Sequence, residues 1–153
     1  MSHQGKTVLV TGASKGIGRA SAIALAKADF HVIALARSTE ALEQLDDDIK
    51  SATGDNATLI TLDLKDVASI DAIAAPLLER FGKLDALFAN AGMLGTIGPL
   101  QTVSPKSFED TINVNLTANW RLIRALHPLL RESASGRALF VSSGVVPRPR
   151  AFW

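Results

Sequence analysis

The chain has 153 residues, of which 47% are hydrophobic and 20% charged, with a net charge of +1 at pH 7. This length favours one domain with its own core, and the balanced charge gives no reason to expect a nucleic-acid partner. There is no cysteine, which excludes disulfides and thiol catalysis, and the three scattered histidines predict no metal site.

The amino-terminal sequence MSHQGK leads directly into a short apolar run. It lacks the hydrophobic segment of a secretory signal, and the chain has no apolar run long enough to cross a bilayer. We therefore expect a cytoplasmic protein with no membrane partner.

Five short apolar runs predict β-strands. They are TVLV (7–10), HVIALA (31–36), ATLITL (57–62), LDALFA (84–89) and RALFVS (137–142). Apolar residues at helical spacing lie between them and predict four helices. Strands that alternate with helices in this way indicate βαβ units. The prediction is one α/β domain over 1–153, with a doubly wound parallel sheet.

The four predicted helices differ in their sequence signals. The first begins after Gly16, and the second has Ser38 as its N-cap. The third covers 70–81, with a kink expected at Pro76, and the fourth is a long helix over 105–131.

The sequence TGASKGIG (11–18) joins the first strand to the first helix. Gly12 permits a tight turn, Gly16 lets the backbone approach a phosphate, and Gly18 lets the helix pack closely on its strand. In this context the motif favours dinucleotide phosphate binding over a plain glycine-rich connection. The candidate residues are Thr11, Gly12, Ser14, Lys15, Gly16, Ile17 and Gly18.

Three further motifs follow in order: NAG (90–92), NVNLT (113–117) and SSG (142–144). Together with the spacing T-G-x-x-x-G-x-G, they resemble the short-chain dehydrogenase/reductase family, and the resemblance runs from residue 6 to residue 153. It implies a Rossmann-type fold and an oxidoreductase that transfers a hydride between a nicotinamide cofactor and a small carbonyl or alcohol substrate.

The resemblance also implies roles for single residues. Asn90, Ala91 and Gly92 match the segment that lines the cofactor cleft and stabilises the sheet. Asn115 matches the asparagine that holds a water in the family's proton relay, and Ser143 matches the catalytic serine that hydrogen-bonds the substrate oxygen. Without the resemblance, Asn115 would be interpreted as a helix-interior amide with a local bond.

Asp63 and Leu64 match family residues that contact the adenine. From local chemistry alone, Asp63 equally suits a cap for the next turn.

The end of the second strand bears on the choice of cofactor. Enzymes that bind NAD usually carry an acidic residue there for the ribose 2′-hydroxyl, and this chain has Ala36. Arg37 follows, and Lys15 lies in the glycine loop, so two cations flank the place of a 2′-phosphate. Singly they would be ordinary surface cations, but as a pair they favour NADP(H).

The family's catalytic tyrosine and lysine, in the pattern Tyr-x-x-x-Lys, would fall just beyond Trp153, and the chain contains no tyrosine. The sequence therefore resembles the amino-terminal part of a longer reductase, inactive as it stands, whose fifth strand would be an unprotected edge. One alternative is a nucleotide-binding module without catalysis. Another is a serine hydrolase, which would need His31 or His127 as a base.

The stretch 105–131 carries more large apolar residues than one sheet-facing stripe requires. They are Phe108, Ile112, Leu116, Trp120, Ile123 and Leu126. Members of the resembled family commonly pair through this helix, so we expect a homodimer or homotetramer of the intact protein.

Overall fold

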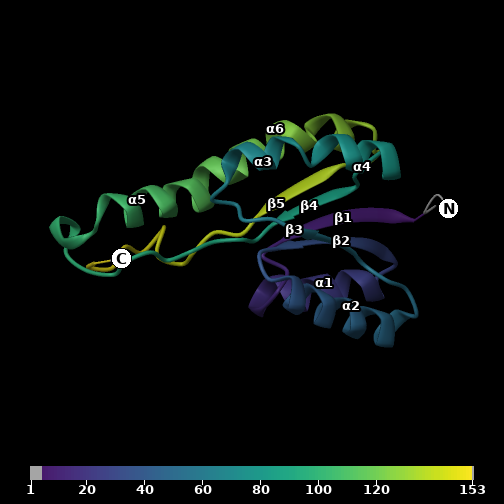
Figure 1. The fold of residues 1–153 in the computed structure, drawn as a ribbon, viewed down its shortest axis with the longest axis horizontal. Helices are drawn as coiled ribbons and strands as arrows, with labels where there is room; N and C mark the ends of the chain where they lie inside the picture. The colour runs from purple at the N-terminus through teal and green to yellow at the C-terminus, as the bar shows by residue number, and fades with distance from the viewer. Residues whose placement is uncertain (1–4, 153) are drawn as a thin grey trace.

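The computed structural model describes residues 5–152 as a five-stranded sheet between two layers of helices (Figure 1). The strands are β1 (Lys6–Thr11), β2 (Phe30–Ala36), β3 (Thr58–Thr61), β4 (Ala86–Ala89) and β5 (Arg137–Phe140). All pairings are parallel, and the order is β3-β2-β1-β4-β5. The predicted fold class is confirmed. Residues 1–4 and 153, and with them the expectation drawn from the amino terminus, lie outside the described residues.

Alternate residues of each inner strand face opposite helical layers. Val8 and Val10 pack among the residues of α1 (Gly16–Lys27) and α2 (Thr39–Thr53) on one face. Leu9, between them, packs on the other face against α3 (Val67–Asp71), α4 (Ala74–Phe81) and α6 (Ala118–Arg131). Because successive strand residues point to opposite faces, a wholly apolar strand is buried on both.

Four helical regions connect the strands, as predicted, and the first two are single helices. Ala22 and Ala26 are the buried residues on the sheet-facing side of α1, and their small side chains allow close packing. Ser38 caps α2, since its Oγ accepts a hydrogen bond from the Ala41 N–H at 3.2 Å.

The third helical region is divided, in place of one kinked helix over 70–81. Asp66 caps α3, where its Oδ1 accepts a hydrogen bond from the Ser69 N–H at 3.3 Å. The next helix, α4, begins at Ala74, so Pro76 lies in its first turn. A proline there interrupts no hydrogen bond, because first-turn N–H groups have no partner within the helix.

The fourth helical region also differs from the long helix predicted over 105–131. It consists of α5 (Pro105–Ile112), a π-helical segment η2 (Asn113–Thr117) and then α6. A short 3-10 helix, η1 (Leu100–Thr102), precedes it. In Figure 1, α5 and the chain after β5 extend away from the sheet as an arm.

A buried carboxylate fixes the amino ends of the two central strands. Asp85 accepts hydrogen bonds from the Thr7 N–H at 2.8 Å, the Ser133 hydroxyl at 2.6 Å and Lys83 Nζ at 3.0 Å. Burial raises the pKa of Asp85, but the bonds from Ser133, Thr7 and Lys83 outweigh it and hold the pKa below its usual value. The charged carboxylate therefore ties β1 to the segments before β4 and β5.

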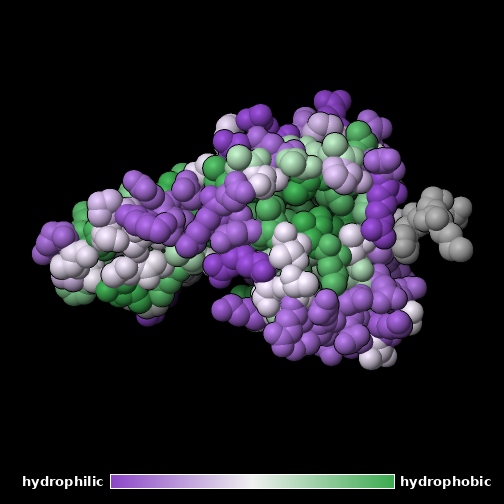
Figure 2. All heavy atoms as spheres, in the orientation of Figure 1, coloured by the Kyte–Doolittle hydropathy of each residue, from purple (hydrophilic) through white to green (hydrophobic). Residues whose placement is uncertain are grey.

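Within the described residues, β5 has a neighbouring strand on one side only. Its side chains are exposed, including Leu139 (52%) and Phe140 (46%). Figure 2 shows hydrophobic surface between the two polar helical layers, over the region where Figure 1 draws the sheet. The expected unprotected edge is present in this structure.

Of the helices within residues 5–152, none is both long enough and apolar enough to cross a membrane.

Candidate cofactor-binding site

A cleft of about 430 Å³ opens at the carboxyl ends of β1, β2 and β4. Because β1 has β2 on one side and β4 on the other, the chain changes direction across the sheet here, which is where doubly wound sheets bind ligands. The lining residues come from the end of β2, from the segments after β1, β2, β3 and β4, and from η2. They are Gly12, Ser14–Ile17, Leu35–Arg37, Leu62–Lys65, Asn90–Met93 and Val114.

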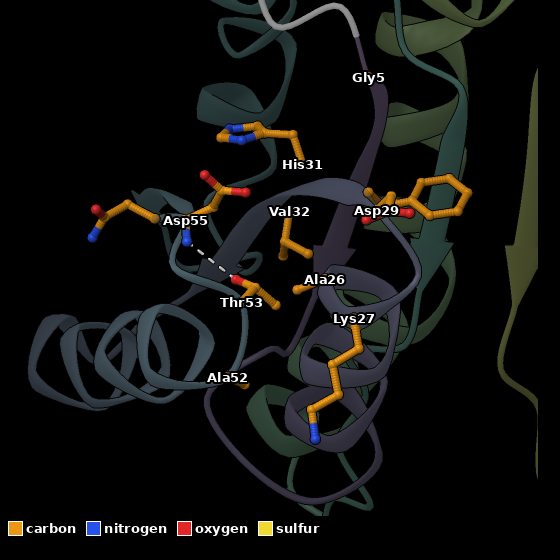
Figure 3. A pocket seen from close by; sticks show the side chains of 11 residues that line it. Gly5, Ala26, Lys27, Asp29, His31, Val32, Ala52, Thr53 and Asp55 are labelled. Carbon is orange, nitrogen blue, oxygen red and sulfur yellow. Dashed lines mark hydrogen bonds between the residues drawn. The ribbon is translucent and has the colours of Figure 1, made fainter.

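A second hollow, of about 410 Å³, lies at the opposite end of the sheet (Figure 3). Gly5, His31 and Asp55 are among its lining residues, and none of the predicted site residues is. The end of α2 closes one side, where the Asp55 N–H donates to Thr53 Oγ1 at 3.2 Å. Ligands of α/β sheets bind at the other end, so the first cleft is the candidate site.

The three glycines of the loop after β1 have different geometry. Gly12 has a φ of +65°, which suits the predicted tight turn. Gly16 has a φ of +56°, and a Cβ there would meet no atom within 4 Å, so the space before it is open. At Gly18 a Cβ would lie 2.3 Å from the Gly12 carbonyl oxygen. Gly18 therefore allows close packing behind the cleft and does not line it.

The first turn of α1 faces this open space without a side-chain cap. Its N-cap residue is Lys15, and the Lys15 side chain makes no capping hydrogen bond. The first N–H groups of a helix have no partner within the helix and carry positive partial charge. This arrangement fits an anionic phosphate group.

Thr11 joins the loop after β1 to the loop after β4. Its fully buried side chain accepts hydrogen bonds from the N–H groups of Asn90 and Ala91, both at 3.0 Å. In return, Asn90 Nδ2 donates to the Thr11 carbonyl oxygen at 3.0 Å. Thr11 thus supports the wall of the cleft without lining it, whereas Asn90, Ala91 and Gly92 all line it.

The glycine loop after β1 and the end of β2 carry the residues predicted to select the cofactor. Arg37 and Lys15 both line the cleft, and the residue at the end of β2 is the buried Ala36. Asp63 and Leu64 also line it. The helix cap after β3 is Asp66. Asp63 caps the turn before that helix, because its Oδ1 accepts a hydrogen bond from the Lys65 N–H at 3.0 Å, so the alternative of a turn cap is also present in the structure.

Lys65 and Met93 line the cleft but were not predicted. Each directly follows a predicted segment, Asp63–Leu64 or Asn90–Gly92, so its position next to a motif was the available signal.

The Asn115 side chain is bonded to the loop after β4 and not within its own helix. Its Oδ1 accepts from the Met93 N–H at 2.9 Å, and its Nδ2 donates to the Met93 carbonyl oxygen at 2.8 Å. This pair of bonds joins η2 to a segment of the cleft wall. The alternative of a local helical bond is therefore wrong for this side chain.

Ser143 lies in the turn after β5, where its Oγ accepts from the Val145 N–H at 3.3 Å. It does not line the cleft. No hydrogen bond joins it to Asn115 among residues 5–152. Because β4 and β5 are parallel neighbours, Ser143 and the loop after β4 follow their strands at the same edge of the sheet.

The described part of the chain holds no cluster of three or more histidine, aspartate or glutamate side chains that could bind a metal ion.

The sequence model of the short chain dehydrogenase family matches residues 6–153. The chain belongs to the short-chain dehydrogenase family. Among its relatives, the uncharacterized oxidoreductase YciK of Escherichia coli (strain K12) is 37% identical over 150 residues, which are 97% of this chain and 60% of that protein. The NADPH-dependent pterin aldehyde reductase of Arabidopsis thaliana is 35% identical over 139 residues, covering 91% of this chain and 57% of that protein.

Solved structures of the family have the same fold, and one of them is a complex with NADP. A short chain dehydrogenase from Shigella flexneri 2a (strain 301), complexed with NADP, superimposes with a TM-score of 0.92 at 35% identity. The superposition covers 97% of this chain and 63% of that one. The chain therefore spans about 60% of the length of the E. coli relative and 63% of the Shigella protein.

Proposed function

We propose that this chain binds NADP(H) in the cleft and forms the cofactor-binding part of a short-chain oxidoreductase acting on a carbonyl or alcohol substrate. The observation that carries the proposal is the cleft itself. It has an open glycine loop at a helix N-terminus, two lining cations in Lys15 and Arg37, and Ala36 in place of a carboxylate at the end of β2. The NADP complex of the Shigella relative and the NADPH dependence of the Arabidopsis relative support it.

The residues present fit the parts of a dinucleotide. The pyrophosphate would lie against Gly16 and the uncapped first turn of α1, where backbone N–H groups and open space coincide. The adenine would lie beside Asp63 and Leu64. The 2′-phosphate would lie between Lys15 and Arg37, because the guanidinium donates two parallel hydrogen bonds to a phosphate and the ammonium adds charge.

Replacing Arg37 with aspartate tests the assignment of the 2′-phosphate. We expect Arg37→Asp to weaken NADP(H) binding by about 1–3 kcal/mol, because a charge-assisted contact is lost and repulsion is added. Affinity for NAD(H) should fall less, or rise. Calorimetric titration of both cofactors gives the two affinities. Arg80→Asp, an exposed charge reversal on α4 outside the cleft, is the matched control. Equal losses for both cofactors at Arg37→Asp would contradict the assignment.

The bound cofactor would supply or accept the hydride. Ser143 would orient the substrate oxygen by a hydrogen bond, but an unperturbed serine hydroxyl is a poor acid at neutral pH, and Asn115 has no titratable proton. Since the chain has no tyrosine, these residues do not include the family's proton donor.

A second candidate function is nucleotide binding without turnover, which needs no tyrosine. A serine hydrolase is not supported. His31 lines the hollow at the opposite end of the sheet, and neither it nor His127 lines the cleft.

We propose that the outer face of α5, η2 and α6 binds a second copy of the chain. Ile123 and Leu126 belong to the core or pack against it, so they do not contribute to this face. The other predicted apolar residues are exposed and recur every fourth position: Phe108 (54%), Ile112 (38%), Leu116 (63%) and Trp120 (53%). Arg124 lies over the Trp120 ring at 5.4 Å. Tryptophan and arginine are the residues that most often dominate interface energies.

Sedimentation velocity tests this association. At micromolar concentration we expect a dimer or tetramer for the unmodified chain and a monomer for Trp120→Glu, because the interface would lose its largest apolar side chain and a charged group would have to be desolvated in its place. Leu78→Glu, at an exposed position on α4 outside this face, should leave the association unchanged. An unmodified chain that sediments as a monomer would show that this face is not an interface between copies.

A further inference from the structure

Lys65 lines the cleft, but its ammonium group is bonded to α5. Lys65 Nζ lies 2.9 Å from Asp110 Oδ2, although the two residues are 45 positions apart. The Asp110 side chain is only 17% exposed. The ion pair therefore links the turn after β3, on the adenine side of the proposed site, to the helix that precedes η2.

The backbone of Lys65 holds the Asp63 side chain. The Lys65 N–H donates to Asp63 Oδ1 at 3.0 Å, and the Asp66 N–H donates to the Asp63 carbonyl oxygen at 2.9 Å. No hydrogen bond engages Asp63 Oδ2 within residues 5–152. That oxygen remains able to accept a hydrogen bond from an amino group of a base.

We propose that Asp110 is a positioning residue for adenine binding, which acts through Lys65 on the Asp63–Lys65 turn. This inference rests on the proposed function. Without the ion pair, the turn would be held only by its own local bonds, and Asp63 and Leu64 would be less often in the orientation that a base requires. Ordering the turn in advance lowers the conformational entropy lost on binding.

The charge of Asp110 is secured by its two lysine neighbours. The hydrogen bond from Lys65 is the main cause that holds the pKa of Asp110 below its usual value; burial opposes it, and Lys106 adds to it. The carboxylate is therefore ionised at neutral pH. Lys106 lies one helical turn before Asp110, 82% exposed and 3.3 Å from it. It shares the carboxylate but makes no hydrogen bond to the turn after β3 in the described part of the chain, so it offers a matched control.

A different role for Lys65 would predict the opposite effect of Asp110→Asn on nucleotide affinity. If Lys65 were a phosphate-binding cation that Asp110 holds back, Asp110→Asn would release the ammonium and strengthen the binding of anionic nucleotides. If Asp110 positions the turn, the same substitution weakens binding.

The experiment compares two ligands that each represent one half of the cofactor. Titrations of the 153-residue chain use 2′,5′-ADP, which carries the adenine, and nicotinamide mononucleotide, which does not. We expect Asp110→Asn and Lys65→Met each to weaken 2′,5′-ADP binding by about two- to fivefold, the scale of a partly exposed ion pair. The double variant should lose no more affinity for 2′,5′-ADP than the single variant that binds it more weakly. Nicotinamide mononucleotide should bind as before, Lys106→Met should have no effect, and Lys65→Arg should retain binding.

Backbone hydrogen exchange measures the turn without any ligand. The Lys65 amide should exchange faster in Asp110→Asn than in Lys106→Met. Unchanged exchange, tighter 2′,5′-ADP binding, or equal losses for both ligands would overturn the inference. If the unmodified chain binds neither ligand, the proposed function fails with it. If that chain binds and the variants bind equally well, only the role of Asp110 fails.

Discussion

Replacing Gly18 with alanine is expected to lower the stability of the domain and to weaken NADP(H) binding. An added Cβ would lie 2.3 Å from the Gly12 carbonyl oxygen and 2.5 Å from Asn90 Nδ2. Since the nearest obstacle is backbone, the glycine loop or α1 must shift. Overpacking of this kind costs about 1–3 kcal/mol. The shift would also move the N–H groups proposed to bind the pyrophosphate, and we expect affinity to fall at least about tenfold.

Urea unfolding and NADPH titration measure the two effects of Gly18→Ala. Gly54→Ala is the control, because Gly54 faces open space and caps the C-terminus of α2, outside the cleft. Its φ of +85° makes alanine strained by about 1–2 kcal/mol, so it should lower stability and leave NADPH affinity unchanged. Normal stability and affinity for Gly18→Ala would show that α1 does not pack against the loop as described.

Carbonyl reduction by the 153-residue chain is expected to lie below detection. A general acid contributes a factor of about 10²–10⁴ to such a reaction, and the chain has no tyrosine. Ser143 also lies outside the cleft, so the residue proposed to position the substrate is not assembled with the cofactor site.

A chimaera tests whether supplying the missing proton donor produces carbonyl reduction. Extending the chain through the Tyr-x-x-x-Lys segment of a longer relative should yield NADPH-dependent carbonyl reduction, and Ser143→Ala in that protein should remove most of it. Ser142→Ala, at the neighbouring hydroxyl, should retain most of it. Robust NADPH oxidation with a carbonyl substrate by the purified 153-residue chain would mean that the proton donor lies elsewhere.

The parallel sheet could be predicted because its signals are local. The apolar runs are short, the helix-spaced runs between them are longer, and Ser38 and Gly18 have roles that follow from their neighbours. The interruptions in the third and fourth helical regions could not be predicted in this way. Apolar spacing continues through both, and the π-helical segment has Asn115 bonded to Met93, a residue 22 positions earlier that only the folded chain brings close.

The candidate site was predictable where residues belong to a motif after a strand. Thr11 and Gly18 belong to such a motif, yet they support the wall of the cleft from behind. The motif alone does not distinguish residues that line the cleft from residues that support it. The link between Lys65 and Asp110 has no sequence signal, because ion pairs between distant segments depend on tertiary packing. Ser143 follows its strand as predicted, but the chain after β5 runs into the arm and not into the cleft.

We expect the cleft to bind NADP(H) in preference to NAD(H). Titration of the folded 153-residue chain with NADPH and NADH, with circular dichroism to verify folding, tests it most directly. We expect one NADPH per chain, bound at least about tenfold more tightly than NADH, because Lys15 and Arg37 meet a charge that NADH lacks. A folded chain that binds neither cofactor, or that binds both equally, would contradict the claim.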